Sequence, residues 1–392
     1  MSVQDRRVSA RADVAEPSAD ELQTLWDRVV GRRSFLRQAG LVGATATGVS
    51  AVSAGGATAR AHKAGGPTPG DFAVLRFLAA AELIETDLWE QYADFGGVKG
   101  KNETYMSALE NLDEDMPQYI SDNTDDEQSH AAFINAYLRS KGQRPVNLDR
   151  FRTLDPSKAT GGGTAKRLTN LTSLNVDTSW YLRYRSTKNP DFGASFGQAV
   201  TIKNQPVIPV DDAETPPGGM APVPPTTRAQ QRMQAIANSA GFHFAMIEQG
   251  GSSLYTTMSM KVTSLEVLRI VVAIGGVEVN HFAIWHDKAG NAVADPLGGN
   301  VKDPITGTSF PDLNKSGSEA TQTNLIMPEP CEFIPGLPDC SVIRPTLDPL
   351  AGAMAAVNAL TADGLFDGQS PAFFRAITRL ARAADAAERR LG

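Results

Sequence analysis

Two of the five histidines in the chain follow a glutamate by three residues, and both pairs lie in stretches with helical periodicity. The pairs are Glu127 with His130, in "DDEQSH", and Glu278 with His281, in "GGVEVNHFAIWH". This spacing puts a carboxylate and an imidazole on one face of a helix, about one turn apart. An ionised Glu278 beside an apolar stretch is costly unless another charge offsets it. The sequence therefore favours a helical fold that brings both pairs to a metal ion.

Apolar residues recur at helical spacing in four long stretches of the chain. We expect helices over 71–95, 125–142, 226–261 and 264–290, and a lesser one over 103–116. Hydrophobic residues make up 41% of the chain, which is enough for a sizeable core.

The connections between these helices predict an all-α four-helix bundle over 71–290. The turn between the third and fourth long helices is so short that the two must be antiparallel neighbours. The first two can also be neighbours, through a modest connection. Residues 143–226 are rich in glycine and proline, and we expect an irregular excursion there with a strand hairpin near 199–210. This inserted excursion is long enough to be a crossover between the second and third long helices.

Residues 291–392 are expected to form a surface-wrapping tail with two C-terminal helices, near 348–362 and 371–391. The last helix is amphipathic and can pack on the bundle or on a second copy of the chain, so a homo-oligomer stays open. Acidic residues interrupt its polar face, which disfavours a membrane-surface role. Cys331 and Cys340 can form a disulfide outside the cytoplasm, where they would act as a structural clip.

Each helical hairpin also carries a glutamate on its other helix. Bundles that hold two metals through bridging carboxylates take one Glu from each of two helices and one Glu-x-x-His from each of the other two. Six residues complete such a set: Glu82, Glu127, His130, Glu248, Glu278 and His281. Four carboxylates and two imidazoles suit two divalent transition metals, iron first and manganese as the alternative. Glu85 is the alternative to Glu82, as a bridging or supporting carboxylate.

Aromatic residues follow three of these glutamates at a spacing of seven, which is close to two helical turns. The pairs are Glu82 with Trp89, Glu85 with Tyr92, and Glu248 with Tyr255. Each ring is expected on the face of its own glutamate, where it would wall the site and support the ligands.

Simpler explanations exist for each motif. Thr124 to Glu127 matches a capping box, in which Glu127 would only close a helix start. The acidic run 122–126 is then a solvated helix start, or a guide for cations. Glu278 and His281 alone could be a buried ion pair. The second copy of the Glu-x-x-His motif favours a metal site over these alternatives.

Two further groups near the expected ligands have ordinary alternatives. Gly250-Gly251 and Gly275-Gly276 indicate either close packing of two helices or room for a small oxidant. His243 and His286 lie five residues from Glu248 and His281, so they point elsewhere and are expected to be structural or surface residues.

The N-terminal region resembles an export signal. Arg32-Arg33 precede a weakly hydrophobic stretch rich in small residues, which is typical of the twin-arginine route. We expect a signal peptide over 1–61 and a periplasmic or extracellular protein. The alternative is a surface arginine pair before a flexible linker. No stable membrane span is expected, because the stretch is short of strongly apolar residues. The net charge of −7, with no basic stripe, argues against nucleic acid as a partner.

The six-residue set resembles the ferritin-like superfamily, and most closely the exported ferritin-like domain proteins that include the desiccation-related group. In that group the first helix looks like "LE..E..FY", which "AELIETDLW" matches with Trp89 in place of tyrosine. Glu248 and Tyr255 match its third-helix pattern "E......Y". The resemblance covers 71–290 apart from the excursion. The chain differs from rubrerythrins in having no CxxC module, and it is much longer than a storage ferritin subunit.

The resemblance implies a di-iron or iron/manganese centre with no catalytic residues beyond the metal ligands. Oxidation of metal, or reduction of oxygen or peroxide in stress protection, is the implied activity of an oxidoreductase of this kind. One alternative is a non-catalytic structural or desiccation-protective bundle whose metal is only stabilising. Another is an oxygen-dependent enzyme for an organic substrate, with an apolar channel lined by 143–226.

Overall fold

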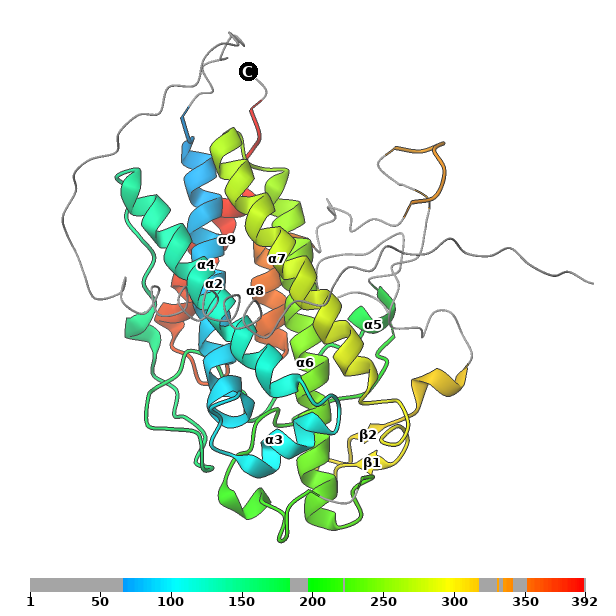
Figure 1. Ribbon diagram of the computed structural model, residues 1–392. Coiled ribbons are helices and arrows are strands. Elements are labelled where there is room, and N and C mark those ends of the chain that lie inside the picture. Colours follow the sequence, from blue (N-terminus) through cyan, green and yellow to red (C-terminus); the bar gives the residue numbers. More distant parts are fainter. Residues whose placement is uncertain are drawn as a thin grey trace, which may run out of the picture. The chain divides into compact units, whose positions relative to one another are not determined.

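The computed structural model describes residues 66–183, 197–220, 223–316, 330, 334–340 and 351–390. Four long helices dominate this part of the chain, as Figure 1 shows. They are α2 (Pro69–Gly96), α4 (Met116–Ser140), α6 (Arg228–Ser259) and α7 (Leu265–Gly290). The expected signal peptide and Cys331 lie outside the described residues.

The four helices pack as two hairpins, α2 with α4 and α6 with α7. Thr68 and Asp71 form a capping box at the start of α2, and Thr227 and Gln230 form one at the start of α6. Asp71 also accepts hydrogen bonds from the backbone of Thr263 and Ser264, in the turn before α7. This one carboxylate therefore joins the two hairpins at one end of the bundle. The four long helices confirm the all-α fold predicted from the sequence.

Shorter elements surround the bundle. They are α3 (Glu103–Glu110), α5 (Trp180–Arg183), α8 (Ala353–Ala362), α9 (Pro371–Asp385), and a two-stranded antiparallel sheet of β1 (Val301–Lys302) and β2 (Ser309–Phe310). Single turns of 3₁₀ helix lie at Asp149–Phe151, Asp212–Glu214 and Leu313–Ser316. The helices α8 and α9 pack against each other, α9 on α2 and α8 on α6 (Figure 1). The C-terminal helices thus cover one side of the bundle in the same chain.

Two local predictions were wrong. The second long helix begins at Met116 rather than near 125, because Pro117 fits the first turn of a helix and the acidic run continues it. The hairpin expected near 199–210 does not form among the described residues. Gln205 instead makes an isolated bridge to Leu174, so this segment pairs with a distant part of the crossover.

Helix α7 is long and apolar enough to cross a membrane by length and composition alone, and it is the single such helix in the described part of the chain. It packs along α6 in the bundle and carries buried Glu278 and His281. Of its most apolar stretch, 44% is buried within the described residues.

Candidate metal centre

The six residues singled out from the sequence converge inside the bundle. Each of the four long helices contributes: Glu82 from α2, Glu127 and His130 from α4, Glu248 from α6, and Glu278 and His281 from α7. Their ligand atoms form two groups, and within each group the atoms lie within 4.8 Å of one another. The first group is Glu82, Glu127, His130 and Glu278, and the second is Glu127, Glu248, Glu278 and His281. Glu127 and Glu278 belong to both groups.

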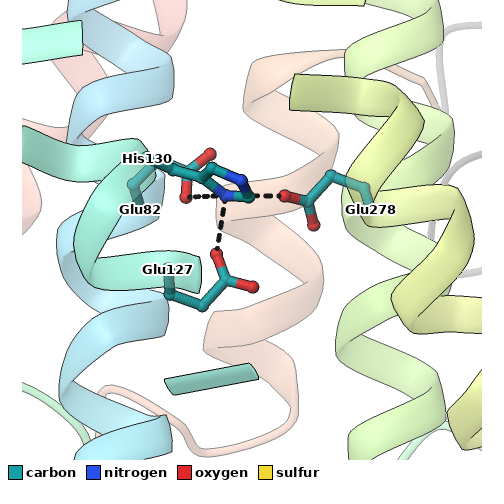
Figure 2. Close-up of side chains that lie close together, drawn as sticks. All are labelled: Glu82, Glu127, His130 and Glu278. Carbon is teal, nitrogen blue, oxygen red and sulfur yellow. Dashed lines mark hydrogen bonds and ion pairs between the residues drawn. The ribbon is translucent and has the colours of Figure 1, made fainter. Parts of the chain in front are cut away.

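His130 lies at the middle of the first group, as Figure 2 shows. Its Nδ1 atom is 3.3 Å from Glu82 Oε2, 3.3 Å from Glu127 Oε2 and 3.2 Å from Glu278 Oε1. Glu278 approaches from α7, on the opposite hairpin from the other three residues. One imidazole nitrogen and three carboxylates therefore face a common point.

The second group is arranged around His281, with two carboxylates on its Nδ1 atom rather than three. Its Nδ1 atom is 3.1 Å from Glu127 Oε1 and 3.4 Å from Glu248 Oε2. The other ring nitrogen, Nε2, is 3.1 Å from a carboxylate oxygen of Asp126. A proton on Nε2 shared with Asp126 leaves Nδ1 as the electron-pair donor, which is how supporting carboxylates orient metal-binding histidines.

The donors in both groups are buried and short of partners. The carboxylates of Glu82, Glu127 and Glu278 are fully buried, and Glu248 is 1% exposed. Among the described residues, one oxygen each of Glu82 and Glu248, both oxygens of Glu278, and Nδ1 of His281 have no partner at hydrogen-bonding angles. All of these atoms except Glu278 Oε2 are held instead by histidine–carboxylate contacts of 3.1–3.4 Å. Four ionised carboxylates carry a charge that two divalent ions would balance with both imidazoles neutral. The residues present therefore fit a pair of divalent metals.

Burial and mutual contacts also shift the protonation of the metal-free cluster. Burial raises the pKa of Glu82 to about 7 and raises that of Glu278 well above its ordinary value. For Glu127, burial is outweighed by hydrogen bonds from the two histidines, which lower its pKa to about 2. The same carboxylates raise the pKa of His130 and His281 against the effect of burial. Protonated imidazoles would offset part of the buried carboxylate charge, and a bound cation would compete with these protons because metal ligands must be deprotonated.

Two aromatic residues bond to glutamates across the bundle. The indole nitrogen of Trp89, on α2, donates to Glu248 Oε1 on α6 at 3.1 Å. The hydroxyl of Tyr255, on α6, donates to Glu82 Oε1 on α2. The seven-residue spacing had paired each ring with the glutamate of its own helix, and the structure exchanges the partners. Sequence spacing gives the face of a helix but not which neighbour that face meets.

Asn123 is a supporting residue that the sequence analysis missed. Its amide donates to Glu127 Oε1 at 2.9 Å and to Glu248 Oε1 at 3.1 Å. Its carbonyl oxygen accepts from the indole of Trp285 at 2.7 Å, and Trp285 stacks on Trp89 at 5.2 Å between ring centroids. Asn123 lies four residues before Glu127, on the same helix face, and that spacing was the available signal.

The capping alternative for Glu127 is wrong. Helix α4 begins two turns earlier, at Met116, so Thr124 is an interior residue. Its hydroxyl donates to the backbone carbonyls of Trp89 and Ile120 rather than to a helix start. The acidic run is likewise not a helix start, and Asp126 within it contacts His281.

The remaining candidates take other places. Glu85 belongs to neither group. The hydroxyl of Tyr92 bonds to His243 Nδ1 at 2.7 Å, away from the cluster. His243 is buried, and His286 is buried among aromatic rings, so neither is a surface residue.

The helical glycines mark close contacts. A Cβ atom on Gly251 would lie 2.8 Å from Glu278 Oε2, and one on Gly275 would lie 2.8 Å from Cβ of Tyr255. Real Cβ atoms essentially never come this close. At these two positions the absence of a side chain lets α6 and α7 approach with a carboxylate or a tyrosine between them.

Comparison with known proteins places this geometry in a family. The sequence model of the ferritin-like domain matches residues 70–291, which is more than half of the chain and includes all six clustered residues. We found no significant similarity to a curated protein or to a solved structure. The desiccation-related group is thus not tested by a relative. The family match and the helical bundle agree, and the chain belongs to the family of proteins with a ferritin-like domain.

Proposed function

We propose that this chain binds two divalent transition metals in a carboxylate-bridged centre and that the centre oxidises metal or reduces oxygen or peroxide. The observation that carries the proposal is the pair of four-residue groups that share Glu127 and Glu278. A carboxylate with an oxygen in each group is suited to bridging two ions. Glu82 and Glu248 each belong to one group, so they would be terminal ligands. The sequence had left those two residues either terminal or bridging.

The chemistry of the donors favours iron, with manganese as the alternative. Carboxylate oxygens and imidazole nitrogens form a mostly hard ligand set, and no described thiol is present among them. When bound, a pair of such ions supplies Lewis acidity and electrons for the reduction of oxygen or peroxide.

The protein residues prepare the site in three ways. Burial of the carboxylates excludes bulk water and strengthens every electrostatic interaction in the cluster. Asn123 and Trp89 hold Glu248 through hydrogen bonds, and Tyr255 holds Glu82. Asp126 fixes the ring of His281. These contacts pre-orient the ligands and make the buried negative charge tolerable before metal arrives.

Export and stress protection belong to the same proposal. Arg32-Arg33 and the stretch of small residues after them support the twin-arginine route, which exports folded proteins. A centre assembled inside the bundle would then be filled in the cytoplasm and carried out in place. Removal of oxidant outside the cytoplasm is the protective role that we infer from this combination.

Elemental analysis of the full-length mature chain tests metal binding. We expect close to two transition-metal ions per chain after anaerobic loading with ferrous iron and removal of excess. The double variant Glu278→Ala with His281→Ala should retain less than one. Glu266→Ala is the matched control, because Glu266 lies on the same helix but is exposed, and it contacts Lys141 and Tyr137 rather than the cluster. It should retain two ions.

Two outcomes would refute parts of the proposal. Less than one metal per chain in the unaltered protein, unchanged by the double variant, would contradict the metal centre. Two bound metals with no consumption of oxygen or peroxide above that of the double variant would contradict the redox activity. The bundle would then be a structural or protective protein that uses metal for stability.

A further inference from the structure

A small cavity lies between the metal-binding bundle and the C-terminal helices. Its walls come from α2, α6, α8, α9 and the segment between α8 and α9. The cavity volume is about 30 Å³. The lining side chains are apolar with one exception, the carboxyl group of Glu85, and they include Phe77, Leu88, Ile247, Val357 and Phe366.

The cavity reaches the backbone beside the cluster. Gly251 lines it, and a Cβ atom at that position would lie 2.8 Å from Glu278 Oε2. Glu278 is one of the two carboxylates shared by both metal groups. A molecule in the cavity is therefore separated from the proposed bridging ligand by a glycine that has no side chain to intervene. The 2.8 Å distance supports close packing at this glycine, and the space for a small molecule is the cavity itself.

Size and polarity limit what can occupy this space. Pockets for organic ligands measure roughly 300–1,000 Å³, so a volume of about 30 Å³ excludes an organic substrate. Water and hydrogen peroxide need several hydrogen-bond partners, whereas cavities lined only by apolar side chains stay dry and accept apolar guests such as xenon. Apart from Glu85, the side chains that line this cavity are apolar. What fits is a small, uncharged, apolar molecule.

We propose that this cavity is a binding site for dioxygen next to the metal centre. The inference rests on the proposed function, and it selects dioxygen over peroxide as the oxidant that the protein holds. The family match ends at residue 291, whereas Val357, Leu360 and Ile377 of the cavity wall come from α8 and α9. The C-terminal helices thus supply a feature that the matched domain does not contain. An apolar channel was expected along residues 143–226, but none of these residues lines this cavity.

Xenon is the probe for the test, because it is apolar and scatters X-rays strongly. Crystals of the full mature chain, without added metal, would be pressurised with xenon. We expect one xenon peak among Leu88, Gly251 and Val357. Ala356→Leu should reduce the xenon occupancy at least several-fold, because Ala356 lines the cavity and the larger side chain fills it. Ile377→Phe fills the cavity from α9 and serves as a second variant if the first folds poorly.

A matched control is available on the same helix. Ala355 is partly buried and does not line the cavity, so Ala355→Leu should leave the xenon peak unchanged. In the protein loaded with ferrous iron, Ala356→Leu should slow the oxidation of that iron by limiting dioxygen several-fold and leave its oxidation by peroxide unchanged, with the iron as the electron donor in both assays.

The xenon result decides the inference separately from the proposed function. No xenon peak, an ordered water in its place, or equal occupancy in the filling variants would overturn the gas site even if two metals bind. Equal slowing with dioxygen and peroxide would also overturn it, because the variant would then be disturbing the metal centre. A xenon peak in a chain that binds no metal would leave the cavity standing and would refute the proposed function instead.

Discussion

Replacing His243 with leucine should flatten the pH dependence of stability between pH 7 and pH 5. His243 is 1% exposed, and burial lowers its pKa from 6.5 to about 3. The imidazole therefore takes up a proton more readily in the unfolded chain than in the folded one. Stability falls as the pH drops below 6.5, and the loss continues toward pH 3.

The size of the effect follows from the two pKa values. Each pKa unit corresponds to about 1.36 kcal/mol. Between pH 7 and pH 5 the unfolded imidazole becomes almost fully protonated while the folded one stays neutral, so the free energy of unfolding drops by about 2 kcal/mol from this residue alone. Other groups titrate in the same range. The drop in the free energy of unfolding between pH 7 and pH 5 must therefore be compared between the unaltered chain and His243→Leu.

This difference can be measured by urea unfolding, followed by tryptophan fluorescence at pH 7 and at pH 5. A metal chelator is present in both measurements. The unaltered chain should lose about 2 kcal/mol more than the variant. His243→Leu also leaves the hydroxyl of Tyr92 without its partner, which costs about 1–3 kcal/mol at both pH values and does not alter the slope. Tyr92→Phe is the control, because it removes the same hydrogen bond and keeps the buried imidazole. Equal pH losses in the unaltered chain and His243→Leu would refute the argument.

Two more predictions concern the metal site and export. Asp126→Asn should weaken metal binding by roughly 10–100-fold, because Asp126 orients His281 but belongs to neither metal group. A competition titration with a metal-binding dye measures the affinity. An unchanged affinity would show that Asp126 does not support the site. Changing Arg32 and Arg33 together to lysine should keep the chain in the cytoplasm, as cell fractionation would show, and normal export of this variant would contradict the twin-arginine signal.

The bundle and its six converging residues could be predicted because they depend on local periodicity. Apolar spacing fixed the helices, and the i, i+3 pairs fixed which side chains share a face. The chain order then required α6 and α7 to be neighbours. The start of α4 was missed because the acidic residues near 125 imitate a helix start, although Pro117 is typical of the first turn of a helix.

What could not be predicted depends on how one helix meets another. Trp89 and Tyr255 bond to glutamates on opposite helices, and Glu127 and Glu278 are shared, because of the rotation and offset between packed helices. Spacing within one helix contains no information on either quantity. The pairing of Gln205 with Leu174 is also non-local, and propensity alone favoured a local hairpin.

The division of ligands between the hairpins sets an order of events during synthesis. The α2–α4 hairpin carries three of the six residues and the α6–α7 hairpin carries the other three, and each metal group takes residues from both. A growing chain therefore cannot complete the first group until residue 278 has been made, nor the second until residue 281, and both need the hairpins to have docked. Metal occupancy would report that the bundle has finished folding. We propose that the protein is exported in the folded state. Bound metal would then mark the chains that have folded and are competent for export.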